Sequence, residues 1–220
     1  MTVMHEAKRV DDVAFRRLMN RHDFWERMIG AGARLPIRPL IEVDLGPIHL
    51  DRMMGTGPVV LVFVRHAGSA ACNAAMVDFR TNLAPALSDL DAHLVAVSPQ
   101  APQRLAALKR RHDLQFFVAA DPRCALIDAL NIGFASPGAD AILGTNRSVL
   151  PLASVVVADR AGTVRFVDVR ASWATPPEAG RIVSAVASLD KPHRKEPRGY
   201  AAPVLDLGRE KLRRDREAAA

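Results

Sequence analysis

The residues that could form a reactive centre lie close together, directly after the longest wholly apolar run of the chain. That run covers residues 58–64, and Arg65, Ser69 and Cys72 follow it. Its β-branched residues favour a strand buried on both faces, so Cys72 is expected in the first turn of the next helix. Unpaired backbone N–H groups and the helix dipole favour a negative charge there, and Arg65 adds a cation. The pattern predicts a stabilised thiolate, the nucleophilic form of cysteine.

A plainer interpretation applies to the same residues. Free cysteine packs as a small hydrophobe, so Cys72 could simply fill space in the core. His66 could donate a proton to a leaving group, but a loop histidine hydrogen-bonded to the backbone is the interpretation we favour. Asp121 and Asp159 are better explained as a helix cap and a turn residue than as catalytic groups.

Hydrophobic periodicity predicts the elements that must position this centre. Strands are expected in a hairpin at 41–50, at 58–64, 93–97 and 115–119, and in a second hairpin at 154–157 and 163–169. Helices are expected at 10–29, 74–90 with a kink or restart at Pro85, 102–111, 122–130 and 176–189. This order predicts an α/β three-layer sandwich, a mixed sheet with parallel core strands and an antiparallel edge hairpin. Chemistry in such a sheet collects where the carboxyl ends of parallel strands meet helix N-termini.

Length and charge suggest how the chain is organised. With 220 residues, 49% of them apolar, and a net charge of +6, we expect one globular domain with extensions. The predicted parts are an N-terminal helical extension at 1–35, the α/β domain at 36–190 and a basic tail, flexible or helical, at 191–220. The tail mixes both signs of charge and is poor in aromatic residues, so nucleic-acid binding is not expected.

Several classes of protein and site are disfavoured by composition. The run 58–64 is far shorter than the roughly 20 apolar residues of a membrane helix. The N-terminus does not resemble a secretion signal, and two cysteines are too few for a disulfide scaffold, so a reducing, cytoplasmic setting is expected. The histidines and cysteines lack zinc-site spacing, and Gly30-Ala-Gly32 follows a helix rather than a strand. We therefore expect no metal, no cofactor and no membrane association.

Five segments together resemble the redoxin family, also called the alkyl hydroperoxide reductase and thiol-specific antioxidant family, and in particular its peroxiredoxin-like branch. They are the segment 57–65, Cys72-Asn73, the segment 94–100, Asp121-Pro122 before a helix, and the segment 155–162. The resemblance covers about residues 36–189 and implies a thioredoxin-like fold.

The resemblance also implies an activity. In that branch the active loop usually holds two cysteines, and Ser69 occupies the place of the first, so dithiol exchange is not expected. Peroxiredoxins carry Thr or Ser three residues before one peroxidatic cysteine, which Ser69 and Cys72 resemble. The implied protein is an antioxidant oxidoreductase. Cys72 would attack hydrogen peroxide or an organic hydroperoxide, Ser69 would hydrogen-bond the thiolate and the peroxide, and Arg65 would give electrostatic support.

Two features bear on how such a thiol would be completed and reset. The family usually has a Pro or an Arg before the final hairpin strand; Ala153 falls there, unless a shift restores Pro151.

Cys124, expected near the third position of its helix, would lie roughly 10 Å from Cys72, beyond disulfide reach. The reductant would then be an external thiol, a thioredoxin-like protein or a low-molecular-weight thiol, with Cys124 structural. A homodimer is left open. The alternative function is a catalytically degenerate thioredoxin-fold binding or scaffold protein.

Overall fold

A computed structural model describes residues 22–170 and 178–189 of the chain. The predicted basic tail at 191–220 and the first part of the predicted helix 10–29 lie outside the described residues. In chain order the elements are α2 (His22–Arg27), β1 (Leu40–Glu42), β2 (Gly46–Ile48), α3 (Leu50–Thr56), β3 (Val59–Phe63), α4 (Ala70–Asp78), the π-helical segment η1 (Phe79–Leu83), α5 (Ala84–Ser88), β4 (His93–Ser98), α6 (Pro102–Arg111), β5 (Phe117–Ala120), α7 (Ala125–Ala129), β6 (Gly133–Ala135), α8 (Ala139–Leu143), β7 (Val149–Pro151), β8 (Ala153–Ala158), β9 (Val164–Arg170) and α9 (Ala179–Ala187).

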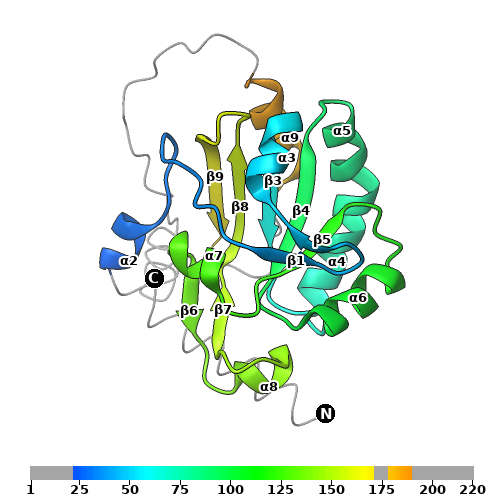
Figure 1. The fold of residues 1–220 in the computed structure, drawn as a ribbon, viewed down its shortest axis with the longest axis vertical. Helices are drawn as coiled ribbons and strands as arrows, with labels where there is room; N and C mark the ends of the chain where they lie inside the picture. Colours follow the sequence, from blue (N-terminus) through cyan, green and yellow to red (C-terminus); the bar gives the residue numbers. More distant parts are fainter. Residues whose placement is uncertain (1–21, 171–177, 190–220) are drawn as a thin grey trace, which may run out of the picture. The chain divides into compact units, whose positions relative to one another are not determined.

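A seven-stranded mixed sheet forms the centre of the fold, in the order β2-β1-β5-β4-β3-β8-β9 (Figure 1). β3, β4 and β5 run parallel to one another. β1 joins β5, and β8 joins β3, in antiparallel pairing, and each continues into an antiparallel hairpin partner. The predicted sandwich with a parallel core is confirmed, with a hairpin at both edges of the sheet rather than at one.

The two faces of the sheet belong to separate apolar cores. Val60 and Val62 of β3 lie in the first core, together with residues of α4, η1, α5, α6 and α9. Val59, Leu61 and Phe63 alternate with them and lie in the second core, with residues of α3 and α7. Burial of each such side chain stabilises the fold by about 1.5–3 kcal/mol. Figure 1 shows α3 and α7 on one face of the sheet and α9 on the other. Side chains of these two helical layers are therefore separated by the sheet.

The first hairpin is confirmed, although its boundaries differ from the prediction. Leu40 pairs with Ile48, so Gly46 and Pro47 lie in β2 rather than in the turn. The second strand ends before Leu50, which begins α3, a helix that was not predicted. Leu50 and Met54, four residues apart, face the second core, and this helical spacing explains why the chain turns away from the sheet here.

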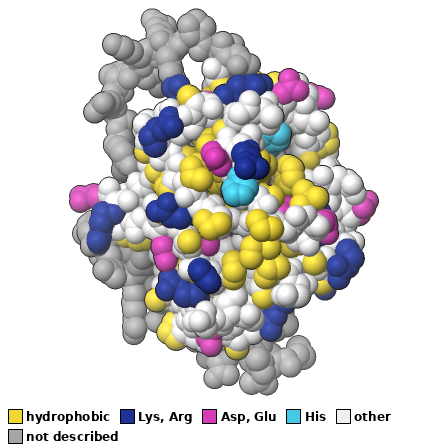
Figure 2. Space-filling view, in the orientation of Figure 1, with side chains coloured by type: hydrophobic (Ala, Val, Ile, Leu, Met, Phe, Trp, Pro, Cys, Tyr) yellow, Lys and Arg dark blue, Asp and Glu magenta, His cyan; other side chains and the backbone are white. Residues whose placement is uncertain are grey.

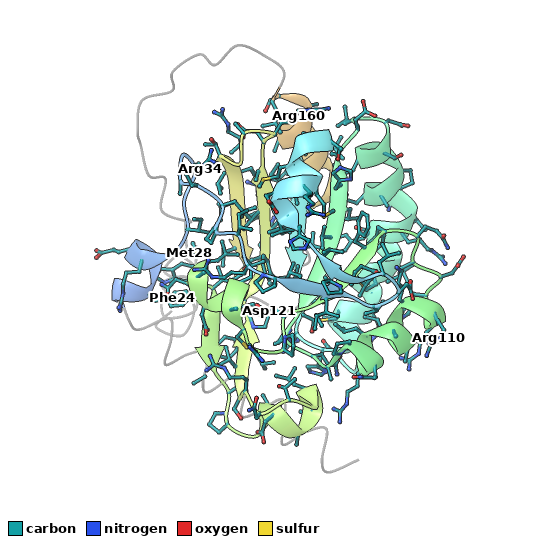
Figure 3. All side chains as sticks on the ribbon, in the orientation of Figure 1. Phe24, Met28, Arg34, Arg110, Asp121 and Arg160 are labelled. Atoms are coloured by element: carbon teal, nitrogen blue, oxygen red, sulfur yellow. The ribbon has the colours of Figure 1, made fainter. Side chains whose placement is uncertain are left out.

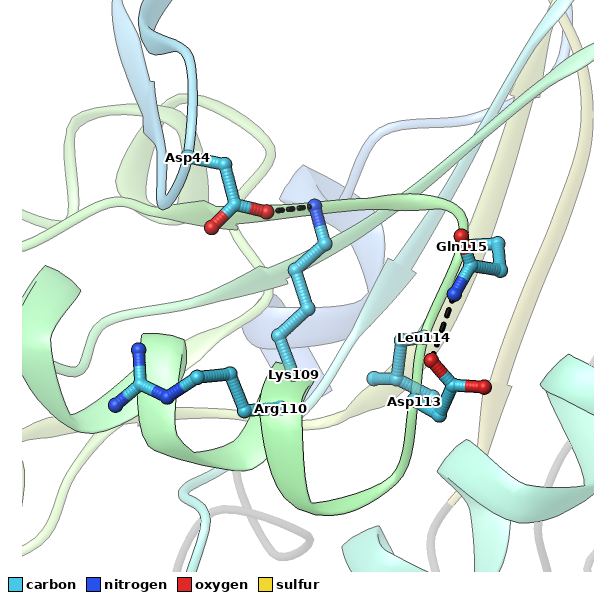
Figure 4. A pocket seen from close by; sticks show the side chains of 6 residues that line it. All are labelled: Asp44, Lys109, Arg110, Asp113, Leu114 and Gln115. Carbon is cyan, nitrogen blue, oxygen red and sulfur yellow. Dashed lines mark hydrogen bonds and ion pairs between the residues drawn. The ribbon is translucent and has the colours of Figure 1, made fainter.

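A buried ion pair fastens this hairpin to α6. The Glu42 side chain is 0% exposed and lies 2.7 Å from Lys109 Nζ, which is also 2.7 Å from Asp44. Burial acts to raise the pKa of Glu42, but hydrogen bonds from Lys109 and backbone N–H groups outweigh it and hold the pKa below its usual value. Lys109 and Asp44 line a polar hollow of about 250 Å³ together with Arg110, Asp113, Leu114 and Gln115. Figure 4 shows these six side chains, with Lys109 turned toward Asp44.

Residues 133–151, where neither a strand nor a helix was predicted, contain a second, two-stranded sheet. β6 and β7 pair antiparallel, and α8 lies between them in the chain. A third core joins Phe134 and Leu150 of these strands with Phe24 of α2, and Met28 packs against it (Figure 3). The described part of the predicted N-terminal helix therefore packs on this small sheet.

The predicted helix at 74–90 begins earlier than expected, at Ala70. It is divided into α4, η1 and α5, with Pro85 at the second position of α5. Proline cannot donate a backbone hydrogen bond to the preceding turn, so a break in the regular helix is expected there. The predicted restart is confirmed, and the earlier start puts Cys72 at the third residue of α4.

Candidate active site

Arg65 and Ser69 lie on the segment that connects β3 with α4, and Cys72 lies in the first turn of α4. Ser69 is the N-cap of α4: its backbone is extended, and its Oγ accepts a hydrogen bond from the Cys72 N–H at 3.4 Å. A serine here satisfies one of the N–H groups that the start of a helix leaves without a helical partner. Cys72 therefore lies in the first turn of a helix that follows the buried central strand, where the sequence placed it.

Arg65 approaches the same serine. Its Nη2 donates to Ser69 Oγ at 3.3 Å. Because Oγ also accepts from the Cys72 N–H, both of its acceptor positions are used, and its own O–H is left to donate. A thiolate sulfur or a peroxide oxygen beside the first turn of α4 could accept that hydrogen bond. Ser69 thus links the predicted cation to the turn that carries the predicted nucleophile.

Cys72 is largely enclosed. The residue is 8% exposed and belongs to the first core, on the face of the sheet that carries Val62 and Val64. This enclosure restricts access to small or slender molecules. The surroundings of this turn are mostly apolar. The polar groups next to them are the Ser69 hydroxyl, Arg65 and the backbone amides at the start of α4.

Polar side chains after the neighbouring strand hold the loop that carries Arg65. Ser98 Oγ donates to the Arg65 carbonyl at 3.1 Å, and Gln100 Oε1 accepts from the Ala67 N–H at 2.9 Å. Gln100 Nε2 donates to the Ile142 carbonyl at 3.1 Å and so ties the loop to α8. Ser98 and Gln100 are buried, and leaving such a buried partner unsatisfied costs about 1–3 kcal/mol. The loop conformation is therefore strongly specified.

Asn73 holds the same loop from α4. Its Nδ2 donates to the carbonyls of Ala67 and Ser69 at 2.7 and 2.8 Å, and its Oδ1 lies 2.5 Å from His112 Nε2. None of Ser98, Gln100, Asn73 and His112 was predicted as a site residue. Ser98 is the last residue of the parallel strand β4 and Gln100 follows it, a position that could have revealed both. The contact of His112 depends on how α6 packs, for which the sequence carries no local signal.

Cys124 has a different environment. It is 0% exposed and lies in the second core, on the opposite face of the sheet from Cys72. The prediction that it occupies the third position of its helix is wrong: α7 begins at Ala125, and Cys124 precedes it in a left-handed conformation with φ 57°. Burial raises the pKa of the Cys124 thiol to about 11, although a hydrogen bond with Arg147 opposes this change.

Asp121 explains why α7 starts late. Its carboxylate accepts hydrogen bonds from the backbone N–H groups of Ala125, Leu126 and Ile127 at 2.8, 2.9 and 3.0 Å. The predicted helix cap is confirmed, but it acts from four residues before the helix (Figure 3). Residues 122–124 form the turn that brings this carboxylate over the helix start, so they are not helical themselves.

A disulfide between the two cysteines would have to cross the sheet. Both thiols are free. β5, the strand before Cys124, is two strands away from β3, and the two side chains lie in different cores. Since a disulfide requires Cα atoms within about 7 Å, direct bridging would need one of the two helix starts to unfold.

Ala153 is the first residue of β8, the first strand of the final hairpin. Ser154 pairs with Phe63, so Ala153 lies beside the start of the active loop. Pro151 instead ends β7. Arg170 of β9 is the cross-strand partner of Ala153, and its guanidinium binds Asp168 at 2.8 and 3.0 Å. The position therefore carries neither proline nor arginine, while a paired arginine lies on the adjacent strand.

The remaining candidates have structural positions. Asp159 accepts from the Thr163 N–H at 2.8 Å and binds Arg165 at 2.6 Å, which confirms its role in the hairpin turn. The His66 carbonyl accepts from the Ser69 N–H at 3.1 Å. Within residues 22–170 and 178–189, no group of three His, Cys, Asp or Glu side chains is arranged to hold a metal ion. The same part of the chain contains no helix that is long and apolar enough to cross a membrane.

The fold and this site define the class of the protein: a thioredoxin-like redoxin domain with a cysteine at the first turn after its central strand. The model of the AhpC/TSA family matches residues 33–167, more than half of the chain. The chain therefore belongs to this family, as a peroxiredoxin-like member. A comparison with curated protein sequences gave no match.

Solved peroxiredoxin structures share the fold at low sequence identity. Reduced Prx3 from Vibrio vulnificus is 19% identical with a TM-score of 0.62, over 73% of this chain and 99% of that chain. Peroxidoxin BcpB from Mycobacterium tuberculosis is 18% identical with a TM-score of 0.61, over 73% and 98% of the two chains. A yeast mitochondrial 1-Cys peroxiredoxin is 14% identical with a TM-score of 0.59, over 77% and 84%.

Proposed function

We propose that this protein is a one-cysteine thiol peroxidase, an antioxidant oxidoreductase that reduces hydrogen peroxide or organic hydroperoxides through Cys72. The observation that carries the proposal is the shared acceptor Ser69 Oγ, which joins Arg65 at 3.3 Å to the Cys72 N–H at 3.4 Å. Membership of the AhpC/TSA family supports the reaction class. The limited exposure of Cys72 suits a substrate whose reacting end is only two oxygen atoms.

The first step of the proposed reaction is the oxidation of Cys72 by the hydroperoxide. The Cys72 thiolate attacks the terminal oxygen of the hydroperoxide, an S–O bond forms, and the O–O bond breaks. Sulfur is oxidised to a sulfenic acid, the peroxide is reduced, and the departing alkoxide or hydroxide takes up a proton. Arg65 stabilises the developing negative charge, and the Ser69 hydroxyl donates first to the thiolate and then to the peroxide oxygen.

An external thiol resets the sulfenic acid. Two thiols of a thioredoxin-like protein or of a low-molecular-weight compound become a disulfide, and Cys72 and one water are produced. The location of Cys124 in the second core supports an external source, because its sulfur faces away from Cys72. The yeast mitochondrial 1-Cys peroxiredoxin is described as using glutathione and thioredoxin systems for thiol resolution. The proposal includes a cytoplasmic setting and leaves the oligomeric state open.

The described surface gives little support for nucleic acid as a partner. Figure 2 shows Lys and Arg side chains spread over the visible face, with Asp and Glu among them, rather than gathered in one basic patch. Affinity for nucleic acid requires several cations that neutralise neighbouring phosphates.

Peroxide labelling tests the proposal. The full-length protein is treated with substoichiometric hydrogen peroxide in the presence of a sulfenic-acid trap, and labelled peptides are quantified by mass spectrometry. We expect the trap on Cys72 and not on Cys124. Ser69→Ala should slow labelling about tenfold, whereas Ser69→Thr keeps a hydroxyl and should stay close to the wild-type rate. Equal, slow labelling of both cysteines would overturn the proposal in favour of a binding or scaffold protein.

A further inference from the structure

The side-chain amide of Asn73 has only one orientation that fits its neighbours. Nδ2 lies 2.7 Å from the Ala67 carbonyl and 2.8 Å from the Ser69 carbonyl. These two acceptors use both amide hydrogens, so Oδ1 must accept from His112 Nε2 at 2.5 Å. The reversed amide would place its oxygen against two carbonyl oxygens. His112 therefore carries a hydrogen on Nε2 and donates it to Asn73.

His112 is itself firmly held outside the loop. It caps the C-terminus of α6, where its N–H donates to the Leu108 carbonyl at 3.2 Å. Its own carbonyl accepts from Arg80 Nη1 of η1 at 3.0 Å. The imidazole thus projects from a backbone that is bonded on both sides, and the ring is half-buried. A ring fixed in this way can limit the movement of the amide that it contacts.

The chain of contacts ends at the two residues on which the proposed chemistry depends. Asn73 follows Cys72 in the first turn of α4. Its side-chain amide donates hydrogen bonds to the carbonyls of Ala67 and Ser69, the residues on either side of Gly68. One of these carbonyls belongs to Ser69, whose hydroxyl contacts the Cys72 N–H. Rotation of the Asn73 amide would remove its hydrogen bonds to both carbonyls and leave Ser69 with fewer contacts to the turn that carries the sulfur, among them the bond from the Asn73 backbone N–H to the Ser69 carbonyl at 3.0 Å.

We propose that His112 is a positioning residue for the thiol centre: by donating from Nε2 to Asn73, it keeps the loop 67–69 in register with Cys72. The inference rests on the proposed function, because it names a residue that sets the geometry of the same site. His112 touches no reacting atom in this scheme. Its effect passes through Asn73 and Ser69, and an error of about 1 Å in such positions can cost up to 10²-fold in rate.

The test compares three substitutions at this position with a matched histidine elsewhere. His112→Gln keeps a donor near the place of Nε2, whereas His112→Ala and the shorter His112→Asn do not. His93→Ala is the control: His93 Nε2 also makes a side-chain hydrogen bond, to Thr56 at 2.7 Å, but it lies at the opposite end of β4 from Ser98. The readouts are the rate of sulfenic-acid formation on Cys72 with hydrogen peroxide and amide hydrogen exchange of residues 65–73.

We expect His112→Ala and His112→Asn to slow sulfenic-acid formation about tenfold and to speed exchange in the loop. His112→Gln should restore both to within about twofold of wild type, and His93→Ala should change neither. Equal losses in all three His112 variants, or a loss in His93→Ala as large as in His112→Ala, would overturn the inference. If His112→Ala does not fold, the comparison of His112→Asn with His112→Gln decides the question.

Failure of the proposed function can be told apart from failure of this inference. If the wild-type protein forms no sulfenic acid, the proposed peroxidase activity is wrong. The positioning role is then judged from hydrogen exchange and from the rate at which iodoacetamide alkylates Cys72, because neither measurement needs peroxide chemistry. An alkylation rate and exchange pattern that His112→Asn leaves unchanged would refute the role of His112.

Discussion

The surroundings of Cys72 and Cys124 differ even though both thiols are buried and both lie at the start of a helix. At α4, a neutral serine caps the helix and an arginine contacts that serine. At α7, the Asp121 carboxylate already occupies three backbone N–H groups, and Asp128 lies close enough to affect the Cys124 pKa. The start of a helix stabilises a thiolate only where its backbone N–H groups are not already hydrogen-bonded to another anion. The two helix starts therefore place different groups beside their cysteines: Ser69 and Arg65 at α4, and two carboxylates together with Arg147 at α7.

Removing each sulfur in turn gives the largest expected effect. Cys72→Ser should lower the peroxide turnover by about 10³-fold or more, because a serine hydroxyl is a far weaker nucleophile at neutral pH. Cys124→Ser should keep the turnover within about threefold of wild type, since its sulfur lies in the second core. Turnover is measured with an excess of an external thiol. Comparable losses in the two variants would contradict the division of roles between the cysteines.

Arg65 tests the electrostatic half of the comparison. Arg65→Met removes the guanidinium that contacts Ser69 and should slow sulfenic-acid formation by about 10²-fold, the usual effect of losing one donor to a developing charge. Arg65→Lys keeps the charge but not the planar fork, so we expect an intermediate rate. Stopped-flow kinetics with hydrogen peroxide provides the measurement. A wild-type rate in Arg65→Met would show that the helix start alone activates the thiol.

Much of this fold could be predicted because single segments carry strong local signals. The uninterrupted apolar run at Val59–Phe63 identified the central strand, and the periodicity of Pro102–Arg111 gave the bounds of α6. The second sheet could not be found, because β6 and β7 are three residues each. Strands of that length show no periodicity, and they depend on contacts with a distant segment, here Phe24 of α2.

The candidate site divides in a similar way. Ser69 and Cys72 are three residues apart, the spacing of an N-cap and the amide it binds, so sequence alone could bring them together. Gln100 and His112 reach the loop from other parts of the chain. Cys124 was misplaced because Asp121-Pro122 resembles a helix start, whereas the carboxylate folds over three later amides. The types of residue at this helix start therefore did not determine the geometry of its cap, and with it the position of Cys124.

The raised pKa of Cys124 predicts that this thiol contributes to a dependence of stability on pH. Its pKa is about 11 in the folded chain, whereas an unperturbed thiol titrates at 9.0. Between these values the unfolded chain loses the proton first, so it binds fewer protons than the folded chain, and stability falls as pH rises. The loss reaches about 2 kcal/mol near the upper end of that window.

Urea unfolding between pH 8 and 10.5 measures this loss as the difference between wild type and variants. Cys124→Ala and Cys124→Ser both lack the titrating group, so their unfolding free energies should decline less steeply than that of wild type, whatever their stability at pH 8. Parallel curves for all three proteins would show that Cys124 ionises as easily in the folded chain as in the unfolded one.

Asp121→Asn should have the smallest effect of these substitutions. It changes the carboxylate that caps α7, which is the main difference between the starts of α7 and α4. Asparagine has one acceptor oxygen in place of two, so part of the cap on α7 is lost, and the unfolding free energy should fall by about 1–2 kcal/mol. Asp128→Asn is the control: the carboxylate of Asp128 is half-exposed and pairs with Arg147 on the surface, an interaction worth about 0–1 kcal/mol.

The same variant alters Cys124 in a defined direction. Burial is the main cause of its raised pKa, and the Asp121 charge adds to it. Asp121→Asn should therefore lower the pKa of Cys124 only in part, and alkylation of Cys124 by iodoacetamide should accelerate while remaining slower than that of Cys72. If Cys124 becomes as reactive as Cys72, the carboxylate rather than the buried setting keeps it inert. If alkylation does not change at all, the anion at the helix start has no influence on the thiol beside it.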